Sequence, residues 1–148
     1  MSVQGENGYA GEISVEAAYG KLAAEAKATL IDVRTEPEWQ YVGTADLSAV
    51  EKAVIYLPWQ VYPAMQILPN FVELLAAELR RRGVNSGDPL LFLCRSGIRS
   101  RHAAVAMTAA GWTSCWNITH GFEGPLDGKR RRSGAAGWKA QGLPWAQT

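Results

Sequence analysis

The chain has few of the features that mark whole classes of protein. Its 148 residues include two cysteines, too few for a disulfide framework, so we expect a reducing, cytoplasmic location. It contains no run of about 18 apolar residues, so we expect neither a transmembrane helix nor a membrane partner. The first residues lack the basic and apolar regions of a signal peptide.

Neither sign of charge dominates, and histidine is scarce. The 15 Lys and Arg residues nearly balance 14 Asp and Glu, giving a formal net charge of +1, so we expect no nucleic-acid partner. Two histidines, His102 and His120, together with one loop cysteine do not supply the roughly four ligands of a zinc site. We therefore expect no metal and no cofactor. The sequence does not indicate an oligomeric state.

What is present is typical of one globular domain. Hydrophobic residues make up 47% of the chain and charged residues 20%. We place the domain at residues 10–148, after a polar, glycine-rich and flexible start at residues 1–9.

Short apolar runs alternate with helical patterns along this domain. Strands are expected at residues 12–14, 29–33, 53–56, 90–93 and 115–118. Helices are expected at residues 15–26, 37–41, 71–82 and 97–110. This alternation predicts an α/β fold with a five-stranded, mostly parallel sheet and helices on both faces. In such sheets, sites form at the carboxyl ends of the strands.

One stretch combines a nucleophile with surroundings that activate it. The apolar run at residues 90–93 ends at Cys94, and small and cationic residues follow before a helical pattern begins. Loop N–H groups and the positive end of the helix dipole converge on such a bend, and Arg95 and Arg99 add full charges. Because these favour the reactive thiolate, we interpret Cys94 as a nucleophile. The alternative is a small buried hydrophobic residue at a strand end.

Three segments, in this order along the chain, resemble the rhodanese (sulfurtransferase) superfamily. Leu30-Ile31-Asp32-Val33-Arg34, with Glu36 and Glu38-Trp39, is similar to an early segment of that family. The stretch Cys94-Arg95-Ser96-Gly97-Ile98-Arg99-Ser100 is similar to its active-site loop. Gly121-Phe122 and Trp138-Lys139-Ala140-Gln141-Gly142-Leu143-Pro144 resemble its closing pattern. The resemblance covers about residues 10 to 145 and implies a rhodanese-like three-layer sandwich.

The resemblance also implies a persulfide cycle. The Cys94 thiolate attacks the sulfane sulfur of thiosulfate or a similar small anionic donor, and the persulfide then passes its outer sulfur to cyanide, a thiol or a protein acceptor. The loop residues that would bind substrate are Arg95, Ser96, Gly97, Ile98, Arg99 and Ser100. Their N–H groups suit a negatively charged sulfur, and guanidinium groups suit oxyanions such as the leaving sulfite.

Two other functions remain as alternatives. Cysteine-based phosphatases of the superfamily resemble C-x5-R, whereas Cys94 to Arg99 is C-x4-R, a shorter loop that suits one sulfur better than a phosphoryl group. A non-catalytic rhodanese-like interaction module is the second alternative. It is disfavoured because Cys94 and its arginines are present.

Four residues outside the loop are candidates for the pocket: Asp32, Arg34, Trp59 and His120. Each also has a structural interpretation. The first two fit a scaffold ion pair or helix cap, Trp59 fits a cover over the sheet edge, and His120 fits a satisfied structural role. Cys115 lies at the start of its strand, so we expect it to be buried, inert and beyond disulfide reach of Cys94.

Two segments depart from the family pattern. Residues 43–50 do not match the turn that the family places there, so that corner is left open. About a dozen additional residues, Pro125 to Ala136, separate Gly121-Phe122 from Trp138, and we expect them to leave the sheet at the same edge as Cys94. This basic insertion contains Lys129 to Arg132. It suits an anion-attracting lid or a contact with an acidic partner or RNA, and the alternative is a solvated loop.

Overall fold

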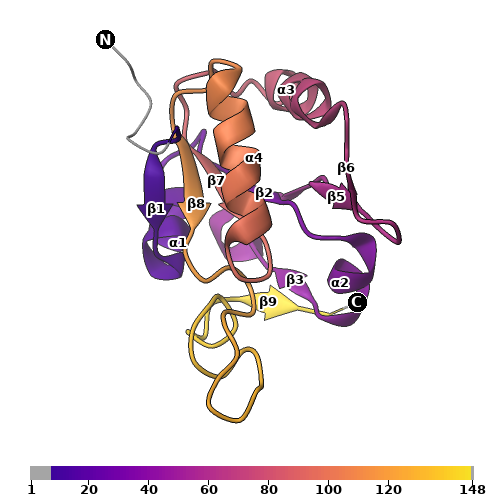
Figure 1. The fold of residues 1–148 in the computed structure, drawn as a ribbon. Coiled ribbons are helices and arrows are strands. Elements are labelled where there is room, and N and C mark those ends of the chain that lie inside the picture. The colour runs from indigo at the N-terminus through magenta and orange to yellow at the C-terminus, as the bar shows by residue number, and fades with distance from the viewer. Residues whose placement is uncertain (1–7, 148) are drawn as a thin grey trace.

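The computed structural model describes residues 8–147 of the chain. Its centre is a five-stranded sheet in the order β1-β8-β7-β2-β4, and every pairing within this sheet is parallel (Figure 1). The strands are β1 (Gly11–Ile13), β2 (Thr29–Asp32), β4 (Ile55–Tyr56), β7 (Leu90–Leu93) and β8 (Cys115–Ile118). The predicted α/β fold with a five-stranded parallel sheet is therefore confirmed.

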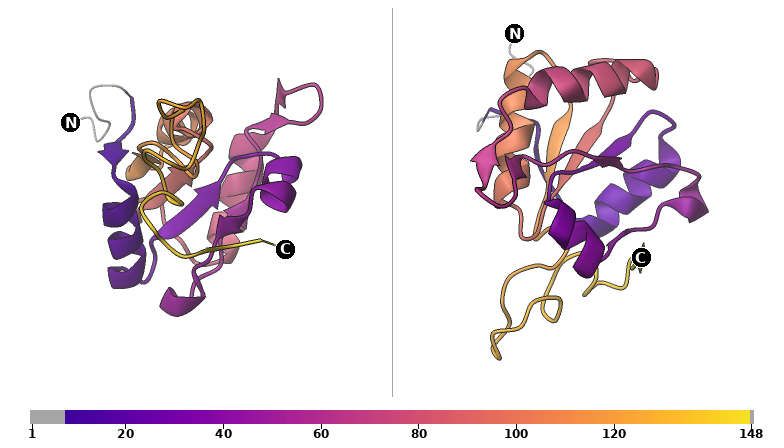
Figure 2. Two further views of the ribbon diagram at one scale, coloured as in Figure 1. Left: turned by 90° about the horizontal axis from the view of Figure 1, so that it is seen from below. Right: turned by 90° about the vertical axis from the view of Figure 1, so that its right-hand side faces the viewer.

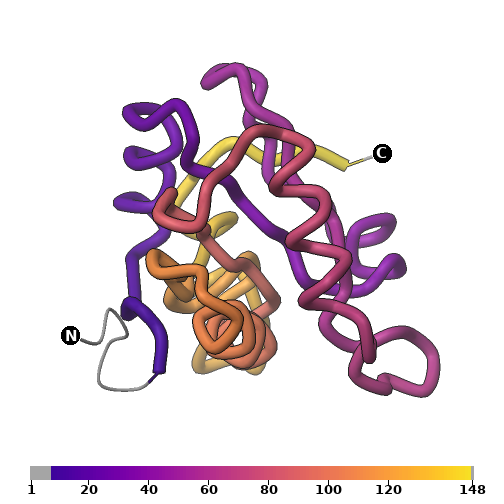
Figure 3. Tube along the Cα trace, turned by 90° about the horizontal axis from the view of Figure 1, so that it is seen from above, coloured from indigo at the N-terminus to yellow at the C-terminus, as the bar shows by residue number. Residues whose placement is uncertain are grey.

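Helices cover both faces of this sheet. One face packs against α3 (Phe71–Arg81) and α4 (Ile98–Ala109), and its central strand residues are Ile31, Leu90 and Phe92. The other face packs against α1 (Val15–Ala24), and its central strand residues are Leu30, Leu91 and Leu93. Viewed along the strands, α1 lies on one side of the sheet and α3 and α4 lie on the other (Figure 3). Because both faces are buried, the central strands are uniformly apolar runs.

Local sequence signals explain where the helices begin and end. The Ser14 side chain accepts a hydrogen bond from the Ala17 N–H and caps α1. Gly83, at φ +76°, follows α3 in the left-handed conformation that commonly ends a helix. The short helix α2 (Glu36–Tyr41) begins with Pro37 in its first turn, as Thr35 and the proline predict.

The structure also contains short elements that the sequence patterns did not predict. The hairpin β5 (Gln60–Val61) and β6 (Gln66–Ile67) and the 3₁₀ helix η1 (Ser48–Val50) are too short for a periodic pattern. The pair β3 (Thr44–Ala45) and β9 (Trp145–Ala146) joins segments a hundred residues apart in the chain. Strand β3 lies within residues 43–50, the segment for which the sequence provided no structural expectation.

The start of the chain is ordered earlier than predicted. Residues 1–7 of the predicted flexible start lie outside the described residues, but Tyr9 is buried and packs into the core beside α3 and α4. Its aromatic ring explains the difference, because burial of a large apolar ring holds the adjoining backbone. Within residues 8–147, no helix is both long and apolar enough to cross a membrane.

Candidate active site

Cys94 lies at the middle of the carboxyl edge of the sheet. It follows β7, which pairs with β2 on one side and β8 on the other. The residue is only 2% exposed. The N–H of Gly97 donates to Sγ at 3.1 Å, and the hydroxyl oxygen of Ser100 lies 3.2 Å from Sγ. The structure thus brings three of the predicted loop residues together around one sulfur atom.

The loop around this sulfur presents unused backbone donors. The loop ends at Gly97, which has a φ of +110° and immediately precedes the first residue of α4. Within residues 8–147, no acceptor is found for the N–H groups of Arg95, Ser96, Ile98, Arg99 and Ser100. Unpaired N–H groups at a helix start, together with the helix dipole, form a site that favours an anion. The loop therefore has the chemistry to hold a negatively charged sulfur or oxygen.

The segment that follows β8 is hydrogen-bonded to the backbone of this loop. The N–H of Phe122 donates to the carbonyl of Cys94 at 2.8 Å, and those of Glu123 and Gly124 donate to the carbonyl of Arg95 at 3.0 and 3.1 Å. A Cβ on Gly121 would overlap the backbone of Cys94 and Arg95. The Gly121-Phe122 motif thus has a steric reason: only glycine lets the two loops approach this closely.

The guanidinium of Arg99 forms an ion pair with Glu38. Its two terminal nitrogens bind the carboxylate oxygens of Glu38 in α2, at 2.7 and 3.0 Å. Although burial opposes it, the hydrogen bonds from Arg99 and Thr35 hold the pKa of Glu38 below its ordinary value. That Arg99 binds the donor stays a prediction, and its guanidinium is already paired with Glu38 in the structure. The pair ties the N-terminus of α4 to α2 and occupies the Nη1–Nη2 edge of the Arg99 guanidinium.

The other predicted loop residues differ in exposure. The Arg95 side chain is exposed, and within residues 8–147 it has no carboxylate partner in an ion pair. Ser96 is half-buried, and Ile98 is 64% exposed. Among the described residues, Arg95 is thus the exposed cation of the loop without an ion-pair partner, and Ile98 is an exposed apolar group beside it.

Asp32 and Arg34 are scaffold residues. Both are fully buried, and the Arg34 guanidinium binds the Asp32 carboxylate, with Nη2 and Oδ2 at 2.8 Å. Arg34 also donates to the carbonyl of Gly43 and lies over the ring of Phe122, 4.3 Å from its centroid. Of the two interpretations, the scaffold ion pair is the one that the structure shows, because neither side chain is accessible to a substrate.

Trp59 and His120 lie beside the site in different ways. Trp59 is half-buried, packs edge-on against Phe71 of α3 at 5.0 Å, and stacks on His102 of α4 at 6.5 Å. It therefore covers the core beside α4, as the structural alternative predicts. His120 is exposed and, at φ +69°, lines a small cavity of about 250 Å³ between α1 and the end of the insertion.

The basic insertion does leave the sheet at the edge that holds Cys94. It extends beyond the carboxyl ends of the strands as a separate lobe (Figure 1, Figure 2). Asp127 organises it by accepting hydrogen bonds from the N–H groups of Lys129 and Arg131 at 2.8 and 2.9 Å. Arg132 binds the carbonyl of Gly124, and the side chains of residues 129–131 are exposed.

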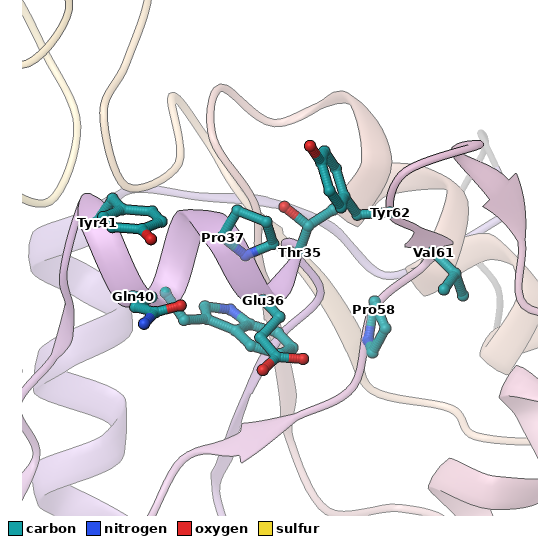
Figure 4. Close-up of a pocket in the computed structure, with 9 residues that line it drawn as sticks. Thr35, Glu36, Pro37, Gln40, Tyr41, Pro58, Val61 and Tyr62 are labelled. Atoms are coloured by element: carbon teal, nitrogen blue, oxygen red, sulfur yellow. The ribbon is translucent and has the colours of Figure 1, made fainter.

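One sizeable cavity does not include Cys94 in its lining. Its volume is about 520 Å³, and it lies between α2 and the segment from Pro58 to Tyr62 (Figure 4). Glu36, Trp39 and Gln40 of α2 line it, whereas Glu38 of the same helix binds Arg99. We place the candidate active site at the cysteine loop and not at this cavity, because the described residues that line the cavity include no cysteine.

Two polar residues at the site were missed from the sequence. Asn117 of β8 is fully buried and binds both the carbonyl of Gly97 and the hydroxyl of Ser100. Glu12 of β1 accepts from Asn117 at 3.0 and 3.1 Å. The available signal was an asparagine within an otherwise buried strand, since a buried amide requires hydrogen-bond partners.

The family model that matches residues 10–148 is described as the STR4 middle domain. The chain belongs to the STR4 middle domain family. A crystal structure of Rv0390 from M. tuberculosis is 43% identical, with a TM-score of 0.82, and the match covers 95% of this chain and 99% of that chain. The uncharacterized protein RC0915 of Rickettsia conorii is 38% identical over 128 residues, which are 86% of this chain and 90% of the relative.

A more distant similarity concerns the fold alone. The solution structure of the polysulfide-sulfur transferase homodimer from Wolinella succinogenes is 21% identical, with a TM-score of 0.57 over 93% of this chain and 78% of that chain. The fold is rhodanese-like, as the resemblance implied. The resemblance is thus confirmed at the level of the fold, and the family whose model matches is the STR4 middle domain.

Proposed function

We propose that this STR4-type domain is a sulfurtransferase that carries sulfane sulfur as a persulfide on Cys94. The observation that supports this most directly is the cysteine loop: one buried sulfur with a hydrogen-bond donor in place, surrounded by backbone N–H groups that have no acceptor within residues 8–147. Such a loop binds a single anionic atom without needing a general acid or base. The rhodanese-like fold is consistent with this chemistry.

The proposed first step is a displacement at sulfur. The Cys94 thiolate forms a bond to the sulfane sulfur of thiosulfate, and the bond between that sulfur and the sulfonate sulfur breaks. Sulfite leaves with the electron pair of the broken bond, so one thiolate and one dianion give one persulfide anion and one dianion. In the second step, cyanide or an acceptor thiolate takes the outer sulfur and returns Cys94 as thiolate.

Access and charge favour a small anionic donor. Cys94 is only 2% exposed, so the reacting sulfur must arrive on a slender group such as thiosulfate, a persulfide or a polysulfide. Arg95 is exposed in the loop itself, and the exposed cations at residues 129–131 lie on the insertion that leaves the sheet at the same edge. An acceptor thiol, free or on a protein, reaches the same opening. We propose that the basic insertion attracts these anionic partners rather than nucleic acid, because it lacks interleaved aromatic residues.

Intact-mass measurement after incubation with thiosulfate tests the proposal. We expect the wild-type protein to gain one sulfur atom and release sulfite, and to lose the added sulfur to cyanide as thiocyanate. Cys94→Ser is expected to do neither, whereas Cys115→Ser, the matched control, is expected to behave as wild type. A folded protein without the adduct would contradict the proposal and favour an interaction module. Cys94-dependent hydrolysis of an aryl phosphate would favour a phosphatase.

A further inference from the structure

The inference concerns the polar groups behind the reactive sulfur, on the side away from solvent. Ser100, at the start of α4, and Asn117, in β8, are both fully buried beside Cys94. Their side chains connect Sγ to Glu12 on the edge strand β1 through consecutive hydrogen-bond distances. Buried polar chains of this kind are constrained, because each unpaired member carries a large desolvation cost.

The orientation of the Asn117 amide follows from its neighbours. Nδ2 lies 3.0 Å from the carbonyl oxygen of Gly97 and 3.0 and 3.1 Å from the two carboxylate oxygens of Glu12. These neighbours are acceptors only, so the NH₂ group must face them and Oδ1 must face Ser100. Oδ1 therefore requires the Ser100 hydroxyl as its donor, at 2.5 Å.

The Glu12 carboxylate is itself well held. It accepts hydrogen bonds from the hydroxyls of Tyr9 and Thr119 and faces Arg101. Although partial burial opposes it, the hydrogen bonds from Tyr9, Asn117 and Thr119 hold the pKa of Glu12 below its ordinary value. Glu12 is thus an acceptor throughout the neutral pH range, and it fixes the Asn117 amide.

A hydroxyl has one proton, and two groups compete for that of Ser100. While the proton is on the Asn117 side, the Ser100 oxygen can only accept, and it suits the S–H of a thiol. A thiolate at Cys94 requires the hydroxyl to turn toward Sγ, which leaves the buried Oδ1 of Asn117 without a donor. In a persulfide the negative charge lies on the outer sulfur, so Sγ no longer requires this proton.

We propose that Asn117, held by Glu12, is a positioning residue that withholds the Ser100 proton from the free Cys94 thiolate and thereby favours the persulfide form. The part about the thiolate stands on the hydrogen-bond geometry alone, and the part about the persulfide rests on the proposed function. Asn117 also holds the carbonyl of Gly97, whose N–H donates to Sγ. One side chain thus controls both groups that face the reactive sulfur from the protein interior.

Charged groups from α4 itself and from three other elements lie near this centre. They are Arg99 of α4, Asp32 of β2, Glu38 of α2 and Glu12 of β1. Among residues 8–147, none of these four hydrogen-bonds to Sγ. Replacing Ser100 or Asn117 with a neutral residue leaves the formal charges of these four groups at neutral pH unchanged.

A double-mutant cycle on alkylation of Cys94 by iodoacetamide tests the proposal without any sulfur donor. The rate is measured at peptide level, at a pH where it still rises with pH, for wild type, Asn117→Ala, Ser100→Ala and the double variant. Asn117→Ala is expected to raise the alkylation rate by a larger factor when Ser100 is present than when it is replaced by alanine. The two factors should differ about three- to tenfold. Loss of the Gly97 contact affects both ratios equally and cancels.

Each result of the cycle is decisive. A ratio that is equal or lower with Ser100 present would show that Asn117 merely supports the loop, and it would overturn the proposal. Thr108→Val removes a buried hydroxyl of the same helix that donates to the carbonyl of Ala104 and lies beside Cys115, not beside Cys94. Its alkylation rate is expected to equal wild type. A change as large as that of Asn117→Ala would attribute both to loosened packing.

A second measurement needs no variant and covers the case in which Asn117→Ala fails to fold. In wild-type protein, the ¹³Cγ resonance of Asn117 is expected to titrate with the same midpoint as the alkylation rate, because Oδ1 loses its donor when Cys94 ionises. A resonance that stays constant through that midpoint would overturn the proposal. Neither measurement depends on sulfur transfer, so a negative result here is distinct from failure to form a persulfide with thiosulfate.

Discussion

The two cysteines lie at opposite ends of the same sheet, and their surroundings are opposite. Cys115 begins β8 and pairs in register with Leu90, whereas Cys94 comes four residues after Leu90, so the two are about 13 Å apart at about 3.3 Å per residue. Both are buried in the same core cluster. The prediction that they cannot form a disulfide fits this separation.

Their hydrogen bonds differ in direction. The thiol of Cys115 donates to the carbonyl of Trp112 at 3.3 Å, and burial raises its pKa to about 11. Cys94 instead receives the N–H of Gly97 and lies at the N-terminus of α4. The comparison teaches that burial alone makes a thiol inert, and that a strand end followed by a helix start supplies the donors that a sulfur anion needs.

The largest expected effect separates the two thiols directly. Cys94→Ser should lower the rate of thiocyanate formation from thiosulfate and cyanide by at least about 10³-fold, because the nucleophile is lost. Cys115→Ala should change that rate less than about twofold. If Cys115→Ala abolished turnover, the assignment of Cys115 as inert would be wrong.

The next largest effect concerns the ion pair between Arg99 and Glu38, which joins α4 to α2 near Cys94. Glu38→Ala and Arg99→Ala should each lower the free energy of unfolding by about 1–2 kcal/mol, because each leaves a partly buried charge unpaired. Both should lower sulfur transfer to a similar extent, and the double variant should be little worse than either. If Arg99 bound the donor directly, Glu38→Ala would free it, and activity would be retained or increased.

The same pair contributes to the pH dependence of stability. The pKa of Glu38 is lower in the folded protein than its ordinary value of 4.5, so below that value the unfolded chain binds protons more readily. The stability from the pair is fully present above about pH 4.5 and is lost as pH falls through the lowered pKa. Urea unfolding between pH 6 and pH 3 should show a shallower decline for Glu38→Gln than for wild type. Equal slopes would contradict this contribution.

A smaller effect tests the Cys115 end. Cys115→Ala should lower the free energy of unfolding by about 1 kcal/mol, because it removes a buried sulfur and a weak hydrogen bond. Thermal or urea unfolding measures this, and the sulfur-loaded mass of Cys94 should be unchanged. A destabilisation without any loss of function would sharpen the contrast between the two ends of the sheet.

The smallest effect concerns charge at the carboxyl edge. Replacing Lys129, Arg130 and Arg131 with glutamine should raise the KM for thiosulfate about two- to fivefold at low salt, and the difference should fade as ionic strength rises. Three exposed lysines or arginines on another face, Lys27, Arg80 and Arg81, make the matched control when changed in the same way. An equal effect in the control would mean that only net charge matters.

Much of the architecture was predictable from local patterns. The apolar runs at residues 29–33, 90–93 and 115–118 form the central strands, because a strand buried on both faces must be apolar throughout. The pattern did not predict the pair β3 and β9, since two-residue strands have no period and pair across most of the chain. It also extended the flexible start through Tyr9, whose ring is held by the core.

At the candidate site, the sequence alone determined the position of Cys94 at a strand end and the loop that follows it. Cys94, the small residues after it and the helix start are adjacent in the chain, so their chemistry follows from local geometry. Only the tertiary structure decided which side chains face the sulfur. Arg99 pairs with Glu38 and Arg34 pairs with Asp32. Asn117 of β8 binds Ser100, which faces the sulfur, and Glu12 of β1 binds Asn117. The physical reason is that charge and hydrogen-bond pairing is satisfied across space, and a sequence lists donors and acceptors without saying which of them meet.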